Sequence, residues 1–249
     1  MRWSDILHYG LGGRSGAAAR DGWDAGRPAG AAAWLRVGGV ARRIHPSYEA
    51  YLAHQAARPD EPEDRLRARQ EGELALFHAR FAACRWLAGS RSVLCLGARL
   101  GSEVRALHAL GHFALGIDLA PGLANLRVLQ GDFHRLVFPD RSLDTVYSHA
   151  FDHAFDLDRL LDEIHRVLRP HGVLIADLTV GTDEGHRPGA FASLSWTSLD
   201  RLLDRLAGHG GFAVKECRSL GNAGLARWRQ VVLVRRLPAQ RATPAVAAA

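Results

Sequence analysis

The sequence contains few cysteines and no long apolar run, and both absences exclude whole classes of protein. Its 249 residues include three cysteines, Cys84, Cys95 and Cys217, which are scattered and form no C-x-x-C pair. We therefore expect neither a disulfide framework nor a metal site. No stretch approaches the roughly 18 consecutive apolar residues of a membrane-spanning helix, and the first residues lack the apolar segment of a secretory signal. These features predict a cytoplasmic protein without a membrane span.

Lysine is almost absent too, and the basic residues do not gather in one place. Lysine and arginine together number 32 against 26 acidic residues, which gives a formal net charge of +6, and Lys215 is the single lysine. A basic chain can favour nucleic acid, but the arginines here are dispersed, so a phosphate-backbone partner is not expected. Hydrophobic residues make up 47% of the chain, which is enough for the core of one large domain.

Composition divides the chain into four parts. Residues 1–45 are rich in glycine, alanine and arginine without an apolar period, which predicts a disordered or weakly ordered extension, with organellar targeting as an alternative. Residues 46–90 carry two helical segments that are expected to pack over one edge of the main domain. The main domain is predicted at residues 91–237, and the tail at 238–249 is predicted to be disordered.

Strands and helices alternate strictly from residue 91 onward. Two apolar runs, 92–96 and 113–117, flank a helical period at 103–110, which together predict a β-α-β unit. The remaining expected elements are strands at 126–130, 145–148 and 173–178, helices at 157–168 and 199–206 with Asp156 and Ser198 as N-caps, and two antiparallel runs at 212–217 and 230–234. This order predicts an α/β fold with a doubly wound, mostly parallel sheet that helices cover on both faces.

The ends of the first two predicted strands carry residues that suit a nucleotide-like ligand. The first strand runs into Gly97-Ala98-Arg99-Leu100-Gly101, where glycines allow close approach of the backbone and a helix N-terminus offers free N–H groups. Asp118 follows the second strand, 21 residues after Gly97, where a carboxylate can accept hydrogen bonds from both ribose hydroxyls.

The third and fourth strands end in the same way. Gly131-Asp132-Phe133 can offer a carboxylate to an exocyclic amine and an aromatic edge to a purine, and the loop from Ser148 to His153 is polar and aromatic. Each signal alone has a structural alternative, since a glycine turn can be a tight corner and an aspartate can simply cap the next segment. Ligands bind at the carboxyl ends of strands in an open parallel sheet, so the four signals together predict one site.

These motifs resemble the class I S-adenosylmethionine-dependent methyltransferases, especially those of the methyltransferase type 11 kind. The resemblance rests on residues 93–101, 116–119, 131–133, 143–146 and 166–172. It implies a seven-stranded, Rossmann-like sheet whose last strand is antiparallel, with S-adenosyl-L-methionine as the cofactor. The loop after the fourth strand lacks the Asn/Asp-Pro-Pro-aromatic signature of amino methylation, which favours a small-molecule acceptor over nucleic acid.

The resemblance also implies a role for each strand end. Gly97 and Gly101 would border the methionine part, Asp118 would hold the ribose, and Asp132 would bind the adenine amine. The full set of implied cofactor-binding residues is Gly97, Arg99, Gly101, Asp118, Leu119, Asp132, Phe133, Ser148 and His149, with Phe133 beside the adenine ring and the last two below the sulfonium.

Two residues depart from the family pattern. The family usually has an acid where Cys95 stands and a glycine where Arg99 stands. Arg99 can grip the cofactor carboxylate, obstruct the pocket, or point outward as a solvated charge. A non-catalytic domain that serves as a ligand-binding or interaction module is therefore the alternative function. A nicotinamide-dependent oxidoreductase fits less well, because G-x-G-x-x-G would require glycine at Arg99 and Ser102.

The catalytic group is left open by the sequence. Methyl transfer needs alignment and exclusion of water, and it needs a base only when the acceptor must lose a proton. The candidates are His149, His153 and Asp152, although histidines four apart on a loop are more often scaffold than ligands or bases. The segment 181–197 is expected to form a lid or an acceptor wall.

Overall fold

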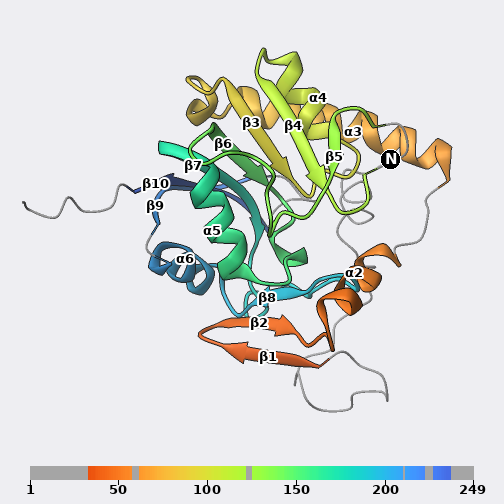
Figure 1. Cartoon of the computed structure of the whole chain (residues 1–249), viewed down its shortest axis with the longest axis vertical. Coiled ribbons are helices and arrows are strands. Elements are labelled where there is room, and N and C mark those ends of the chain that lie inside the picture. The colour runs from red at the N-terminus through yellow and green to blue at the C-terminus, as the bar shows by residue number, and fades with distance from the viewer. Residues whose placement is uncertain (1–32, 58–61, 122–124, 210, 222–226, 237–249) are drawn as a thin grey trace, which may run out of the picture.

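The computed structural model describes residues 33–57, 62–121, 125–209, 211–221 and 227–236. A seven-stranded sheet forms its centre, in the order β5-β4-β3-β6-β7-β10-β9 (Figure 1). These strands are β3 (Ser92–Leu96), β4 (Phe113–Asp118), β5 (Val128–Gln130), β6 (Leu143–Ser148), β7 (Leu168–Thr179), β9 (Phe212–Ser219) and β10 (Trp228–Arg235). Pairs among β5, β4, β3, β6 and β7 are parallel, and β10 is antiparallel to both of its neighbours. The predicted doubly wound sheet with an antiparallel last strand is confirmed.

Helices cover both faces of this sheet because its strands are apolar on both sides. Leu94 and Leu96 of β3 face the core under α5 (Leu157–Val167) and α6 (Leu199–Gly208). Val93 and Cys95 of the same strand face the opposite core, which α3 (Glu63–Ala82) and α4 (Ser102–Ala109) cover. This alternation along one strand reflects the period of two that sends successive side chains to opposite faces.

The predicted helix caps of the main domain are confirmed. The Asp156 side chain accepts hydrogen bonds from the backbone N–H groups of Asp158 and Arg159, which starts α5. The Ser198 side chain accepts from the N–H of Arg201 at the start of α6. These caps satisfy donors that would otherwise have no partner in the first turn of each helix.

A second, smaller sheet lies beside the carboxyl ends of the main strands, and here the structure differs from the sequence prediction. Residues 1–45 were expected to be weakly ordered, but β1 (Trp34–Val37) and β2 (Val40–Arg43) form a hairpin within them. β2 pairs with β8 (Leu194–Trp196), which comes some 150 residues later in the chain. A strand held by so distant a partner has little local signal. Residues 1–32 and the predicted tail at 238–249 lie outside the described residues.

The segment predicted to be helical contains two long helices as expected. The first is α2 (Tyr48–Ala56), with Ser47 as its N-cap, and the second is α3. Short 3-10 turns follow at η1 (Arg85–Leu87) and, in the loop after β6, at η2 (Phe151–His153). α2 lies next to the small sheet, whereas α3 packs along α4 (Figure 1). No helix in the described part of the chain is both long and apolar enough to cross a membrane.

A buried polar network attaches α3 to the sheet. Arg80 of α3 donates to Asp177 Oδ2 at 2.8 Å, and the Tyr147 hydroxyl donates to the same oxygen at 2.8 Å. Gln230 of β10 donates to Asp177 Oδ1 at 3.1 Å. All four side chains are buried, so this network links α3, β6, β7 and β10 inside the core.

Candidate functional site

A cavity of about 520 Å³ lies at the carboxyl ends of the parallel strands. Six of the predicted cofactor-binding residues line it, Gly97, Arg99, Asp118, Leu119, Asp132 and Phe133. Four residues of α2 form a further wall, Tyr51, Leu52, Gln55 and Ala56. Its volume is in the range of cavities that enclose a ligand of cofactor size. The structure thus brings together the ends of four strands, whose lining residues are up to 56 positions apart in the sequence, from residue 97 to residue 153.

Asp118 is fixed at the end of β4 with its carboxylate partly satisfied. Its Oδ2 accepts the backbone N–H of Arg99 at 3.0 Å, and its Oδ1 accepts the N–H of Ala120 at 2.8 Å. Each oxygen therefore uses one of its two lone pairs and keeps one for a ligand. Two adjacent acceptors on one held carboxylate match the two hydroxyls of a ribose.

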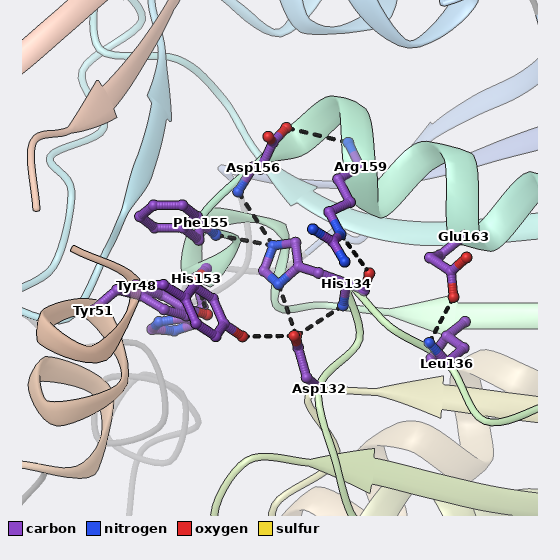
Figure 2. A network of polar contacts seen from close by, with 10 residues as sticks. All are labelled: Tyr48, Tyr51, Asp132, His134, Leu136, His153, Phe155, Asp156, Arg159 and Glu163. Carbon is purple, nitrogen blue, oxygen red and sulfur yellow. Dashed lines mark hydrogen bonds and ion pairs between the residues drawn. The ribbon is translucent and has the colours of Figure 1, made fainter.

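Asp132 carries a denser set of hydrogen bonds (Figure 2). Its Oδ2 accepts the Tyr48 hydroxyl at 2.5 Å, and its Oδ1 accepts both the backbone N–H and the ring Nδ1–H of His134 at 2.8 Å. Although burial opposes it, these bonds lower the pKa of Asp132, so the carboxylate is ionised at neutral pH. Three of its four lone-pair positions are filled, which leaves Oδ2 able to accept one more donor.

His134 holds Asp132 in place and is not a base. Its Nε2 accepts the backbone N–H groups of Phe155 and Asp156 at 3.1 and 3.2 Å, as Figure 2 shows. Since Nε2 accepts there, the proton must be on Nδ1, where it is donated to Asp132. The imidazole is 3% exposed and so forms a fixed link between Asp132 and the start of α5.

An aromatic cluster joins α2 to the segment before α5 beside the cavity. The rings of Tyr48, Tyr51 and Phe155 lie with centroids 5.2 to 5.5 Å apart. The Tyr51 hydroxyl donates to the carbonyl of His153 at 3.0 Å, so α2 is attached to the loop after β6. Sequence reasoning predicted this helix but did not place it at the site, because nothing local in residues 48–56 indicates where the helix docks.

The loop after β6 contains the three proposed catalytic candidates. His153 lines the cavity, and its Nδ1 donates to the carbonyl of Phe191 at 3.1 Å, so its Nε2 is the acceptor nitrogen. The Oδ2 of Asp152 lies 3.8 Å from that Nε2, but Asp152 does not line the cavity. Burial lowers the pKa of His149 to about 4, so that imidazole is neutral at pH 7.

Two of the predicted cofactor residues have structural roles instead of lining a cavity. The Ser148 hydroxyl donates to the carbonyl of Leu96 and accepts the N–H of Ala150, both at 3.1 Å, which shapes the loop. Gly101 is the N-cap of α4 with φ of +70°, a conformation that favours glycine. Both residues therefore support the neighbouring walls.

The segment 181–197, predicted as a lid or acceptor wall, contributes no residue to the cavity lining. It holds two lining residues from behind the wall. The carbonyl of Phe191 accepts hydrogen bonds from His153 Nδ1 at 3.1 Å and from the side-chain amide of Gln55 at 2.8 Å. Trp196 lies in the core and donates to the carbonyl of Thr179.

A second cavity of about 50 Å³ adjoins the first and shares Gly97, Arg99, Ala150 and His153 with it. Its other walls include Arg69, Glu73, Glu103 and His149. The sequence did offer one signal here, since Glu103 lies one turn before Leu107 and so places an acid on the apolar face of α4. Among the described residues, no group of three or more His, Cys, Asp or Glu is arranged to hold a metal ion.

Comparison with known proteins gives matches to one kind of domain. Residues 94–176 match the family model described as "Methyltransferase domain". Over 97 residues the chain is 36% identical to malonyl-[acyl-carrier protein] O-methyltransferase 1 of Coxiella burnetii, covering 36% of this chain and 34% of that protein. Over 112 residues it is 37% identical to glycine/sarcosine/dimethylglycine N-methyltransferase of Actinopolyspora halophila, covering 42% of this chain and 18% of that protein. The chain thus spans about a third or less of these relatives.

A solved structure shares the fold over most of this chain. The 1,6-didemethyltoxoflavin-N1-methyltransferase of Burkholderia thailandensis, solved with 1,6-didemethyltoxoflavin and S-adenosylhomocysteine, superposes with a TM-score of 0.57 at 17% identity. The match covers 82% of this chain and 98% of that one, so the similarity of fold extends well beyond residues 94–176.

Proposed function

Because the α/β domain of this chain belongs to the class I S-adenosylmethionine-dependent methyltransferases, we propose that the chain transfers a methyl group from S-adenosylmethionine to a small-molecule acceptor. The observation that carries this proposal is the 520 Å³ cavity at the strand ends, with Asp118 and Asp132 on its wall. The acceptors in the names of the two relatives differ from each other and do not select one for this chain: malonyl-[acyl-carrier protein] in one, and glycine, sarcosine and dimethylglycine in the other.

The donors and acceptors of the cavity fit the nucleoside of the cofactor. Asp118 has one open lone pair on each oxygen for the two ribose hydroxyls, and Asp132 has one open on Oδ2 for the adenine amine. Phe133 lines the same wall and offers an apolar contact to the purine. Arg99 lines both cavities, which makes its guanidinium available to the cofactor carboxylate.

The bound cofactor supplies an electrophilic methyl group on a sulfonium, and the protein has to align an acceptor with it and exclude water. The α2 wall covers one side of the cavity and would keep water from that side, with Tyr51 attached to the loop after β6. His153 lies where α2 meets that loop, and its Nε2 can accept a proton from an acceptor that must lose one.

Calorimetric titration with S-adenosylmethionine, S-adenosylhomocysteine and NAD tests this function. We expect both sulfur ligands to bind and NAD not to bind. Replacing Asp118 by alanine should weaken binding about 10- to 100-fold, because two charge-assisted hydrogen bonds are lost. The matched control is Asp204→Ala, at an exposed position on α6. Unchanged affinity in folded Asp118→Ala would contradict the ribose assignment.

Turnover measurements on the same samples separate an enzyme from a non-catalytic module. Release of S-adenosylhomocysteine in the presence of a small-molecule acceptor supports the enzyme. For acceptors that must lose a proton, His153→Ala should slow this release, because the acceptor nitrogen that takes the proton is removed. Binding of the cofactor without any turnover across carboxylate, amine, hydroxyl and thiol acceptors would favour the module.

A further inference from the structure

The small cavity behind Gly97 is lined by both basic and acidic side chains. Arg69 of α3 and Glu103 of α4 line it from two helices, and His149 lines it from the loop after β6. Gly97 borders both cavities, with φ of +72° and no side chain to separate them. A ligand held by its nucleoside in the large cavity can therefore extend past Gly97 into a compartment suited to a zwitterion.

One carboxyl oxygen and one imidazole nitrogen of this compartment have no hydrogen-bond partner within the described part of the chain. They are Glu103 Oε1 and His149 Nδ1, which lie 3.9 Å apart, too far for a hydrogen bond with each other. Glu103 is 2% exposed, and buried carboxyl oxygens are nearly always satisfied. A ligand donor placed between these two acceptors would satisfy both.

Glu103 lies on α4 near Cys95, the β3 position at which the methyltransferases that this sequence resembles usually have an acid. Cys95 is fully buried, and burial together with the charge of Glu103 raises the pKa of its thiol, so Cys95 is neutral. Glu73 also reaches the cavity, but it accepts the Ser102 hydroxyl at 2.9 Å and pairs with Arg69. Glu103 is therefore the carboxyl group whose oxygen is left for a ligand.

We propose that Glu103 binds the ammonium group at the amino-acid end of the cofactor and so replaces the acid that β3 lacks. This inference rests on the proposed function. Neutral His149 can accept a second hydrogen of the same ammonium group through Nδ1, and Arg69 adds a second basic group, in addition to Arg99, for the neighbouring carboxylate.

Ligand binding should release a proton if this assignment is right. Burial, followed by the charges of Glu73 and Asp118, raises the pKa of Glu103 well above its usual value, so the free protein holds this carboxyl group protonated to a higher pH than an exposed glutamate. Several titratable or charged groups face it from the elements packed around it. They are Arg69 and Glu73 of α3, Cys95 of β3, Arg99, Asp118 of β4, and His149 and His153 of the loop after β6. An ammonium group favours the carboxylate form, and the carboxyl proton leaves to solvent as the ion pair forms.

The experiment compares S-adenosylhomocysteine with 5′-methylthioadenosine, which lacks the amino-acid end. Titration calorimetry on the full chain measures each affinity in wild type, Glu103→Gln and two controls, Glu73→Gln and the exposed Glu71→Gln. We expect Glu103→Gln to weaken S-adenosylhomocysteine about 10- to 100-fold and to change 5′-methylthioadenosine less than about twofold. Glu71→Gln should change neither.

A second measurement needs no variant. Titrations at pH 7.5 in buffers of different ionisation enthalpy count the protons released, and wild type should release up to about one with S-adenosylhomocysteine and none with 5′-methylthioadenosine. Equal losses for both ligands in Glu103→Gln, or a selective loss in Glu73→Gln instead, would overturn the role of Glu103. Failure of wild type to bind either ligand would overturn the proposed function itself, and this inference with it.

Discussion

Replacing Arg80 by alanine should destabilise the protein strongly, because it removes one partner of a buried ion pair. Arg80 donates to Asp177 at 2.8 Å, and the two side chains are 8% and 0% exposed. Leaving such a carboxylate without its cation costs about 3–5 kcal/mol of the free energy of unfolding. For a chain of this size we expect a fall in Tm of about 6–20 °C.

The matched control is Arg85→Ala, which removes the same kinds of contact at the surface. Arg85 pairs with Glu216 at 2.9 Å and lies over the Trp86 ring, as Arg80 lies over Phe77. Its side chain is 77% exposed, so its loss should cost less than about 1 kcal/mol. Urea unfolding followed by tryptophan fluorescence measures both variants. If both variants lose less than about 1 kcal/mol of the free energy of unfolding, burial does not make the Arg80–Asp177 pair more stabilising than the exposed pair, and the reasoning is refuted.

Two further predictions concern the site. Tyr48→Phe removes the hydroxyl that donates to Asp132. We expect the affinity for S-adenosylhomocysteine, measured by calorimetry, to fall about 3- to 30-fold while the fold is retained. An unchanged affinity would mean that Tyr48 does not position this carboxylate. In the folded protein the pKa of His149 is about 4, below that of a histidine in the unfolded chain. As the pH falls, this histidine is therefore protonated in the unfolded chain first, and the free energy of unfolding decreases from about pH 7 downward. Between pH 7 and pH 5 wild type should lose about 2 kcal/mol more than His149→Gln in urea unfolding, and parallel pH profiles would contradict this.

Local patterns in the sequence were sufficient to predict the main domain. The apolar run of β3, the caps Asp156 and Ser198 and the period of α5 each act over a few residues, so they can be identified without knowledge of the fold. The rule that ligands bind at strand ends then placed Asp118 and Asp132 on one cavity.

The parts that sequence reasoning missed depend on contacts between distant segments. The β1-β2 hairpin gains its partner from residues 194–196, and Tyr48 meets Asp132 across 84 positions. Ser148 was expected below the sulfonium, but its hydroxyl is used by the backbone of Leu96 and Ala150. Neither the docking of a helix nor the partner of a buried hydroxyl is encoded by local spacing.

The wall formed by α2 has a consequence for how acceptor choice can change. Tyr51, Leu52 and Gln55 line the cavity from outside residues 94–176, the part that matches the methyltransferase domain model. Asp118 and Asp132 lie inside that part. Under the proposed function, substitutions at these three lining positions of a nine-residue helix would reshape the acceptor side of the cavity. Tyr48 of the same helix would have to be kept, because its hydroxyl holds Asp132 on the nucleoside side. We therefore expect acceptor selection to diverge through three residues of α2 while cofactor use keeps Tyr48 constant.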